Sequence, residues 1–339
     1  MAKGGGPMIP LSILDLVPIK DDTTPGEALR QSLDLARHAE RLGYTRYWVA
    51  EHHNMIGIGS AATSVVIGHL AAGTSRIRLG SGGIMLPNHS PLVIAEQFGT
   101  LASLFPGRID LGLGRAPGTD LGTLRALRQN ANHAENFPQD VRELQALLAP
   151  VEPGQTIQAV PGGGTNVPIW ILGSSLFGAQ LAAAFGLPYA FASHFSPDAC
   201  LQALELYRAQ FRPSAQAQKP HAMIGVNIIA ADTDAEAKRQ FTSVQQAFTN
   251  ILRDTRGYCP PPIDSIEDHW TASEKAQVSR MLDYSIVGSP ATVRRGLQDL
   301  LAKTHADELM VTAHLHDHPA RVRSYELLAE AGRSLESGT

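Results

Sequence analysis

Short apolar runs of strand length alternate along the chain with longer segments in which apolar residues recur at helical spacing. The first pair of elements shows the pattern. An apolar run over residues 9–16 is followed by Thr24-Pro25-Gly26-Glu27, a capping box with proline at the first helical position. The helix predicted behind it carries its apolar residues on one face and ends at Gly43. The unit is typical of a strand followed by an amphipathic helix.

The same alternation continues toward the C-terminal end. Strands are predicted over residues 9–16, 44–50, 77–86, 108–113, 168–172, 188–192, 222–231 and 308–313. Further helices are predicted over residues 60–74, 91–104, 138–148, 176–185 and 319–331, with others starting at Ser196-Pro197 and Asp232. Eight strands alternating with helices imply a parallel sheet, and the number favours a closed TIM (β/α)8 barrel over an open doubly wound sheet. No GxGxxG motif follows the first strand, which further disfavours a dinucleotide-binding fold.

We expect a single domain over residues 9–332, with a flexible N-terminal arm at 1–8 and a C-terminal tail at 333–339. A chain of 339 residues could form two domains, but α/β barrels commonly use this length as one. Residues 253–283, between the seventh and eighth predicted strands, exceed what a connection needs and contain Cys259-Pro-Pro-Pro262. They predict a lid-like insertion, with a surface excursion of no function as the alternative.

Composition narrows the classes of function. The net charge is −4 with both signs interspersed, which argues against nucleic acid as a main partner. The two cysteines form no CxxC pair, so a reducing, cytoplasmic setting is expected. The N-terminus lacks the apolar core of a signal peptide. The uncharged stretch 153–197 is broken by glycine and proline, which argues against a membrane span.

Two strand ends carry the parts of an anion site. The strand at 108–113 runs into a glycine-rich loop that places the guanidinium of Arg115 at its C-terminal end. The next strand ends in Gly173-Ser174-Ser175 at a helix N-terminus, where hydroxyls and unpaired N–H groups can bind an anion. An ordinary N-cap serine is the alternative. Because the two strands are neighbours in a barrel, Arg115 would face the serines and complete a phosphate site.

Other strand ends carry histidines and glycines. Glu51-His52-His53 follows the second strand, where a histidine could exchange protons and Glu51 could orient one ring, although packing is the alternative role. Gly82-Gly83 within the third strand indicates a bulge or the close approach of a flat ligand. His194 and His314, at the ends of the sixth and eighth strands, are further pocket residues by position.

The run His314-Leu-His316-Asp-His318 has spacing that could bind a metal. No constellation of carboxylates and lysine elsewhere completes a binuclear site. A role at the rim or in capping is favoured, and no metal is predicted.

In these motifs the chain resembles the bacterial luciferase-like flavin monooxygenases, most closely their single-chain "group 1" oxidoreductase branch. The similarity covers roughly residues 9–332. The segments that carry it are Trp48-Val-Ala-Glu-His-His53, Gly80-Ser-Gly-Gly-Ile-Met-Leu-Pro87, Gly107–Asp120, Gly173-Ser-Ser175, Val287-Gly-Ser-Pro290 and Asp307-Glu-Leu-Met-Val-Thr312.

The resemblance implies roles for particular residues. Arg115 matches the family arginine that grips the flavin phosphate, and Ser174 with Ser175 matches its partners at the helix terminus. Gly82-Gly83 falls where the family often carries a non-proline cis peptide against the isoalloxazine. His52 matches the histidine near the reacting flavin. Gly114 replaces a cysteine that is reactive in the luciferases, so light emission is not expected.

The resemblance therefore predicts an FMN-dependent oxidoreductase, a two-component monooxygenase that uses O₂ and reduced FMN from a separate flavin reductase on a small organic substrate. Three alternatives remain: a deazaflavin-dependent oxidoreductase on the same barrel, a metal-dependent barrel hydrolase, and a noncatalytic flavin-binding protein.

The predicted helix over residues 60–74 contains no Asp, Glu, Lys or Arg, although an outer barrel helix should present a solvated face. This predicts a homodimer through this helix and its neighbour at 91–104.

Overall fold

The computed structural model describes residues 9–116, 120–129, 131–255 and 257–334, so the predicted arm at 1–8 and most of the tail at 333–339 lie outside the description. Eight strands form a closed ring in which all pairings are parallel. In ring order they are β1 (Leu11–Asp15), β2 (Arg46–Val49), β3 (Arg78–Met85), β4 (Ile109–Gly114), β5 (Ile169–Gly173), β6 (Tyr189–Phe191), β7 (Ala222–Ala230) and β9 (Glu308–Thr312). The predicted TIM barrel is confirmed.

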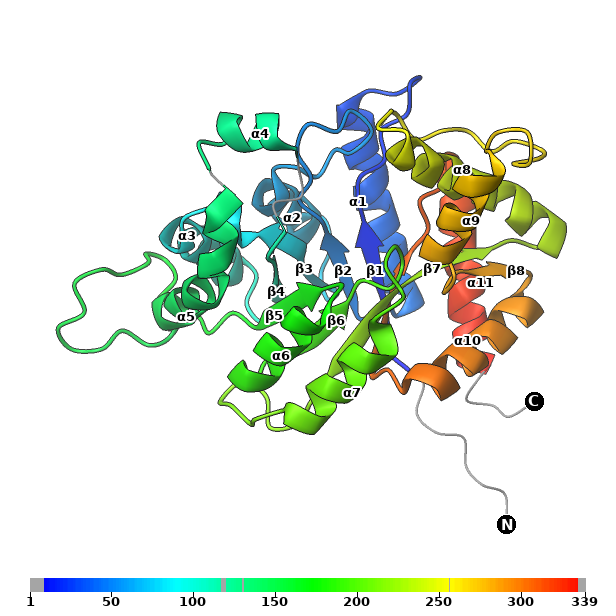
Figure 1. The fold of residues 1–339 in the computed structure, drawn as a ribbon. Helices are drawn as coiled ribbons and strands as arrows, with labels where there is room; N and C mark the ends of the chain where they lie inside the picture. The colour runs from blue at the N-terminus through cyan, green and yellow to red at the C-terminus, as the bar shows by residue number, and fades with distance from the viewer. Residues whose placement is uncertain (1–8, 117–119, 130, 256, 335–339) are drawn as a thin grey trace, which may run out of the picture.

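Helices surround the ring (Figure 1). They are α1 (Pro25–Leu42), α2 (Thr63–Ala72), α3 (Pro91–Leu104), α4 (Leu121–Ala126), α5 (Phe137–Leu148), α6 (Leu176–Phe185), α7 (Cys200–Gln210), α8 (Asp234–Leu252), α9 (Ala272–Met281), α10 (Pro290–Thr304) and α11 (His318–Ser334). In the part of the chain that the structure describes, no helix is both long and apolar enough to span a bilayer.

Local capping explains where the predicted helix boundaries hold and where they fail. Thr24 caps α1 by accepting a hydrogen bond from the Glu27 N–H, and Gly43 ends it in the left-handed conformation. The predicted cap at Asp232 is wrong by one residue, because the extended Thr233 accepts the hydrogen bond from the first turn of α8. The helix expected from Ser196-Pro197 begins only at Cys200, because the Cys200 N–H first closes a turn onto the Pro197 carbonyl.

Alternation along the strands divides the buried apolar residues into two cores. Residues that point outward, such as Ile13 and Val49, pack with the helices in the larger core. Residues that point into the ring form a smaller cluster that consists of Leu14, Trp48, Ala50, Trp170, Ala190, Met223 and Met310. Trp48 and Trp170 meet edge to face, with 5.3 Å between ring centroids, and fill the middle of the barrel.

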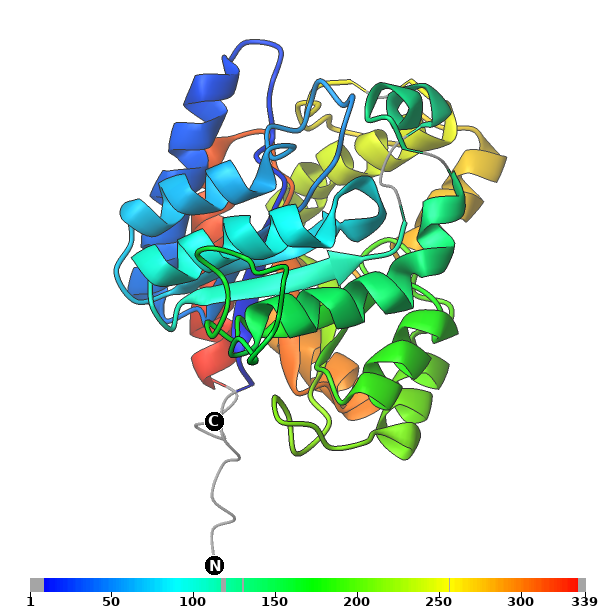
Figure 2. The ribbon, with the colours of Figure 1, turned by 90° about the vertical axis from the view of Figure 1, so that its left-hand side faces the viewer.

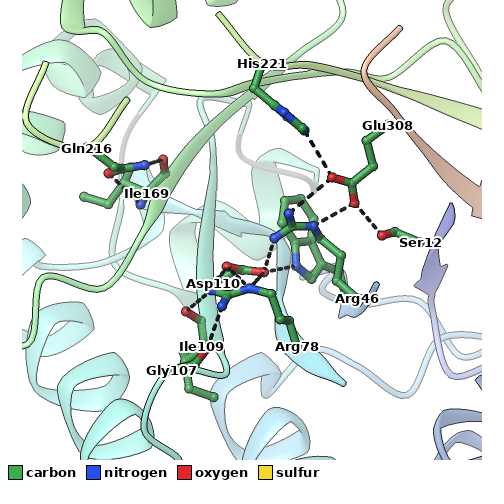
Figure 3. A network of polar contacts seen from close by, with 11 residues as sticks. Ser12, Arg46, Arg78, Gly107, Ile109, Asp110, Ile169, Gln216, His221 and Glu308 are labelled. Carbon is green, nitrogen blue, oxygen red and sulfur yellow. Dashed lines mark hydrogen bonds and ion pairs between the residues drawn. The ribbon is translucent and has the colours of Figure 1, made fainter. Parts of the chain in front are cut away.

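A polar network closes the barrel at the N-terminal ends of its strands (Figure 3). Arg46 lies between two buried carboxylates, 2.7 Å from Asp110 and 2.7 Å from Glu308. Arg78 also pairs with Asp110, and His221 lies 3.1 Å from Glu308. Burial alone would raise the pKa of Glu308, but hydrogen bonds and charge from His221 and Arg46 hold it below its usual range. Two arginines therefore balance two carboxylates at this end.

The connection between β7 and β9 contains more structure than the predicted insertion. Residues 272–281 form α9, and Ile286–Gly288 form a ninth strand, β8, which pairs outside the ring with the last residues of β7. Helix α10 then leads back to β9. The sequence prediction missed β8, because three residues are too few to show a strand pattern.

Candidate active site

A cavity of about 540 Å³ opens at the C-terminal ends of the barrel strands, opposite the polar network. Its space comes from small residues at inward-facing positions of the ring, among them Ala50, Gly82, Gly114 and Gly225. Trp48 and Met310 form its floor. The sequence thus fills the lower barrel with large side chains and leaves the upper barrel open, where active sites of this fold lie.

The glycine pair of β3 forms one side of this cavity. The Gly82–Gly83 peptide bond is cis, as the resemblance implies, and the register of β3 against β4 shifts between Gly82 and Ile84, as expected for a bulge. Any Cβ on Gly82 would lie 2.8 Å from Leu14 Cδ1. One on Gly83 would lie 2.7 Å from the Gly112 carbonyl oxygen. The backbone here is bare, so a flat ligand can lie directly against it.

The predicted anion corner lies on the same cavity. Arg115 follows β4, and its guanidinium carbon lies 4.1 Å from the centre of the Phe177 ring on α6. Gly173, Ser174 and Ser175 lead from β5 into α6 and line the cavity beside it. The Ser175 side chain makes no capping hydrogen bond, so α6 begins with donors that an anion can engage. The structure brings the guanidinium and the helix terminus together as the strand order predicted.

The Glu51-His52-His53 motif divides between two environments. His52 lines the cavity, whereas Glu51 is 1% exposed and does not. Glu51 Oε1 lies 2.8 Å from His53 and 2.9 Å from His89, and Oε2 accepts a hydrogen bond from the Met85 N–H. Burial raises the pKa of Glu51, but these hydrogen bonds outweigh it and keep the carboxylate ionised.

The expectation of Glu51 in the substrate pocket is therefore corrected. Its acceptor capacity is used by His53, His89, Asn88 and the backbone behind the cavity wall. The rings that it contacts are those of His53 and His89. Sequence reasoning missed Asn88 and His89; their place directly after the third strand is the signal that could have found them.

His194 enters the cavity from the loop after β6. Its backbone carbonyl accepts a hydrogen bond of 2.6 Å from Asn227 Nδ2. Its Nδ1 is buried against Gly225, where any Cβ would lie 2.2 Å away, and it has no hydrogen-bond partner among the described residues. Burial, with a smaller contribution from His52, lowers the pKa of His194 to about 4. The imidazole is therefore neutral at pH 7.

The histidines after β9 separate instead of converging. His314 lines the cavity, and burial together with Arg321 lowers its pKa to about 4. His316 lies near the exposed carboxylates of Asp21 and Asp22. His318 lies 2.8 Å from Asp34 of α1. The HxHxH spacing thus serves three different places, because the chain turns from β9 into α11 across this run.

The insertion contributes the remaining wall. Residues 257–260 and Met281 line the cavity together with the inner face of α8. Sequence analysis assigned no site residue here. The signal that could have found them is the position of the insertion directly after a barrel strand and its helix.

Comparisons with known proteins agree with this arrangement. The family model described as luciferase-like monooxygenase matches residues 9–308. An Escherichia coli K12 protein named luciferase-like monooxygenase is 55% identical over 328 residues, covering 96% of this chain and 98% of its own. The N-acetyl-S-alkylcysteine monooxygenase of Bacillus subtilis is 30% identical, covering 96% of this chain and 98% of its own.

Solved structures show the same fold. The crystal structure of apo-MsnO8 superposes with a TM-score of 0.84 at 35% identity, covering 96% of this chain and 98% of its own. The FMN complex of the oxygenating constituent of 3,6-diketocamphane monooxygenase from Pseudomonas putida has a TM-score of 0.74 at 19% identity, covering 95% and 97%. An F420-dependent secondary alcohol dehydrogenase has a TM-score of 0.71 at 13% identity, covering 96% and 99%.

Proposed function

This chain belongs to the luciferase-like monooxygenase family of flavin-dependent enzymes, and on that premise we propose that it is an FMN-dependent monooxygenase. It would take reduced FMN from a separate flavin reductase and use O₂ on a small organic substrate. The observation that carries the proposal is that the Arg115 guanidinium, the N-terminus of α6 and the bare glycine backbone of β3 line one cavity.

The residues present fit the cofactor. Arg115, Ser174 and Ser175 would hold the phosphate by charge-assisted and backbone hydrogen bonds. Gly82 and Gly83 would contact the flat ring, since their backbone carries no Cβ to hold it away. Bound reduced FMN would supply the electrons that activate O₂. The chain's own contribution is to orient the cofactor, exclude water and place His52 at the cavity as the group that gives or takes a proton.

Two further features belong to this proposal. The segment over residues 253–283 would act as a lid, because Tyr258, Cys259 and Met281 line the mouth from above the strand ends. The chain would also form a homodimer through α2 and α3, where Val65 and Leu104 are 71% and 65% exposed. These helices lie side by side on the face seen in Figure 2.

A deazaflavin is the second candidate cofactor, because a phosphate corner serves either group. F420 is named for one neighbour of the same fold, and FMN for another. Anaerobic titration with reduced FMN, and in parallel with a reduced deazaflavin, distinguishes them. We expect one reduced FMN to bind per chain, followed by an oxygen-dependent spectral change slower than that of free reduced FMN. Binding of the deazaflavin alone would replace FMN in this proposal, and binding of neither would remove it.

The role of His52 has its own test. With a substrate identified by oxygen consumption, His52→Ala should lower kcat by roughly 10² while leaving FMN affinity unchanged, as for loss of a general acid or base. His38→Ala, on α1 far from the strand ends, is the matched control. Equal kcat values for His52→Ala and the control would make His52 a packing residue.

A further inference from the structure

The lining of the cavity carries almost no charged side chains. Among the described residues that line it, histidines apart, Arg115 is the only one with an ionisable charge at neutral pH, and no Asp, Glu or Lys contributes. In the proposed function this one cation is taken by the cofactor phosphate. The rest of the cavity then offers no counter-charge to a second ligand, and an ionised group buried without a counter-charge is strongly disfavoured.

The wall away from the phosphate corner is mainly apolar, and the polar residue that α8 adds to the lining, Asn250, is uncharged. The inner face of α8 presents Val244, Ala247, Phe248 and Ile251 to the cavity, and Met281 of α9 extends this surface. We call these five residues the α8–α9 wall. Helices α8 and α9 lie on the β7 side of the barrel (Figure 1), whereas the residues of the phosphate corner follow β4 and β5.

The entrance is apolar as well. Phe195, Ile251 and Tyr258 line the cavity and are also 41%, 44% and 45% exposed. Large apolar side chains that remain exposed at the edge of one cavity are typical of an entry for an apolar ligand.

The polar side chains discussed for this part of the cavity, His194 and Asn227, carry no charge at pH 7 and can offer hydrogen bonds only in fixed directions. The Nδ1 of His194 is buried against Gly225 and has no partner in the part of the chain that the structure describes, which leaves Nε2 as the ring nitrogen for a ligand. Asn227 fixes the loop that carries this ring by donating to the His194 carbonyl. A ring held in this way can orient one polar atom of a ligand but cannot neutralise an ionised group.

We propose that the space between the α8–α9 wall and His194 binds an uncharged, mainly apolar organic molecule, whose single polar group hydrogen-bonds to His194 Nε2. The inference rests on the proposed function for the assignment of Arg115 to the cofactor. It adds the substrate class and names the residues that select it.

The test compares three ligands with similar carbon skeletons: methyl hexyl ketone, octanoate and octylamine. Their binding to the FMN-loaded protein is measured by isothermal titration calorimetry at pH 7. We expect the ketone to bind at least about tenfold more tightly than either charged ligand, because the wall cannot compensate a buried charge. Equal or tighter binding of octanoate or octylamine, or no ketone binding at millimolar concentration, would overturn the inference.

Substitutions of Ala247 test whether these ligands bind against the α8–α9 wall. Ala247→Lys adds a cation there and should shift the preference toward octanoate by about tenfold, whereas Ala247→Met, a neutral side chain of similar length, should leave octanoate weak. A ketone-to-octanoate ratio that is the same in both variants would show that the ligands bind elsewhere and would overturn the inference.

The same titrations without FMN separate the two proposals. A protein that binds FMN but prefers the charged ligands contradicts only the substrate class. If FMN fails to bind, the function proposed above fails, whereas a ketone preference that depends on residue 247 would still support a neutral apolar site.

Discussion

Arg115 contacts the face of Phe177 and has no salt-bridge partner among the described residues, so its charge is available to a ligand. Arg115→Ala should weaken FMN binding by about 10- to 100-fold, since hydrogen bonds to a charged group contribute about 1.5–3 kcal/mol. Fluorescence quenching of FMN measures the change. Arg142→Ala is the matched control, because Arg142 also lies over an aromatic ring, Phe185, but outside the cavity lining. If both variants bind FMN alike, Arg115 is not a phosphate ligand.

His194 and His314 link the cavity to stability at acid pH. Burial lowers the pKa of each imidazole to about 4, against an ordinary value of about 6.5. Between these values the unfolded chain binds more protons than the folded chain, so stability is complete above about pH 6.5 and falls as the pH drops toward 4. His314→Gln should lose less unfolding free energy than the wild type between pH 7 and pH 5.

Urea unfolding at the two pH values measures this difference. His38→Gln, on α1 and hydrogen-bonded to the Asp34 carbonyl of its own helix, controls for removal of a histidine outside the cavity. If the pH dependence of His314→Gln equals that of the wild type, His314 is not neutral and buried in the folded protein.

For individual residues, the position relative to a strand end was enough to predict some members of the site but not others. Arg115, Ser174 and His52 stand directly at strand ends, which all meet at one face of a parallel barrel. The role of Glu51 could not be predicted, because its orientation depends on His89, a residue brought near by a different strand. Nor could the contact of Phe177, since it requires the register between β4 and β5.

Strands β3 and β4 show how glycine spacing shapes an element. Gly112 and Gly114 both face the ring interior from β4, but they have different neighbours. A Cβ on Gly112 would lie 2.1 Å from the Ser81 carbonyl oxygen, which is backbone and cannot move alone. A Cβ on Gly114 would lie closest to Met85 Sδ, at 2.8 Å, in a flexible side chain that can turn away, and the nearest backbone atom, the Ile84 carbonyl oxygen, is at an ordinary 3.8 Å.

Gly112→Ala should therefore lower the free energy of unfolding by about 1–3 kcal/mol or more, as expected for overpacking against a fixed neighbour. Gly114→Ala, the matched substitution two residues along the same face, should cost markedly less. Denaturant unfolding of both variants gives the comparison. Equal losses would mean that β3 can shift away from β4 at the bulge.

Elements with a strong apolar pattern were predictable, and those without one were not. The bounds of α3 and α6 agree with the expected 91–104 and 176–185, because apolar runs and flanking proline or glycine define them. Helix α9 was missed because only Val278 of its ten residues is buried, which leaves no apolar stripe in the sequence. Its fold depends on the Thr271–Glu274 capping box and on packing against α8.

The whole molecule separates stability from chemistry along the barrel axis. The pairs of Arg46 and Arg78 with Asp110 and Glu308 close the N-terminal end with balanced charge (Figure 3), while the opposite end is hollow and nearly uncharged. Removing one partner of a buried pair leaves the other charge unpaired, which is strongly destabilising. The barrel can therefore hold glycines and an open cavity at one end because the other end and the two tryptophans hold the ring together.

The exposed apolar residues of α2 and α3 bear on the oligomeric state of the protein. The exposed residues of α2 are Val65, His69 and Ala72, with no Asp, Glu, Lys or Arg among them, and the neighbouring α3 (Figure 2) exposes Val93 and Leu104. Light scattering should return about twice the chain mass of 36.3 kDa at micromolar concentration. Val65→Glu should return the monomer mass, because the substitution would bury a carboxylate in an apolar interface.

Leu252→Glu is the matched control, because Leu252 is an exposed apolar residue on α8, away from this face, and its substitution should leave the dimer intact. A monomer mass for the wild type would end the proposal of a dimer. A dimer that survives Val65→Glu but not Leu252→Glu would place the interface at α8, beside the mouth of the cavity. In that arrangement the partner subunit, rather than the insertion alone, would control entry to the α8–α9 wall.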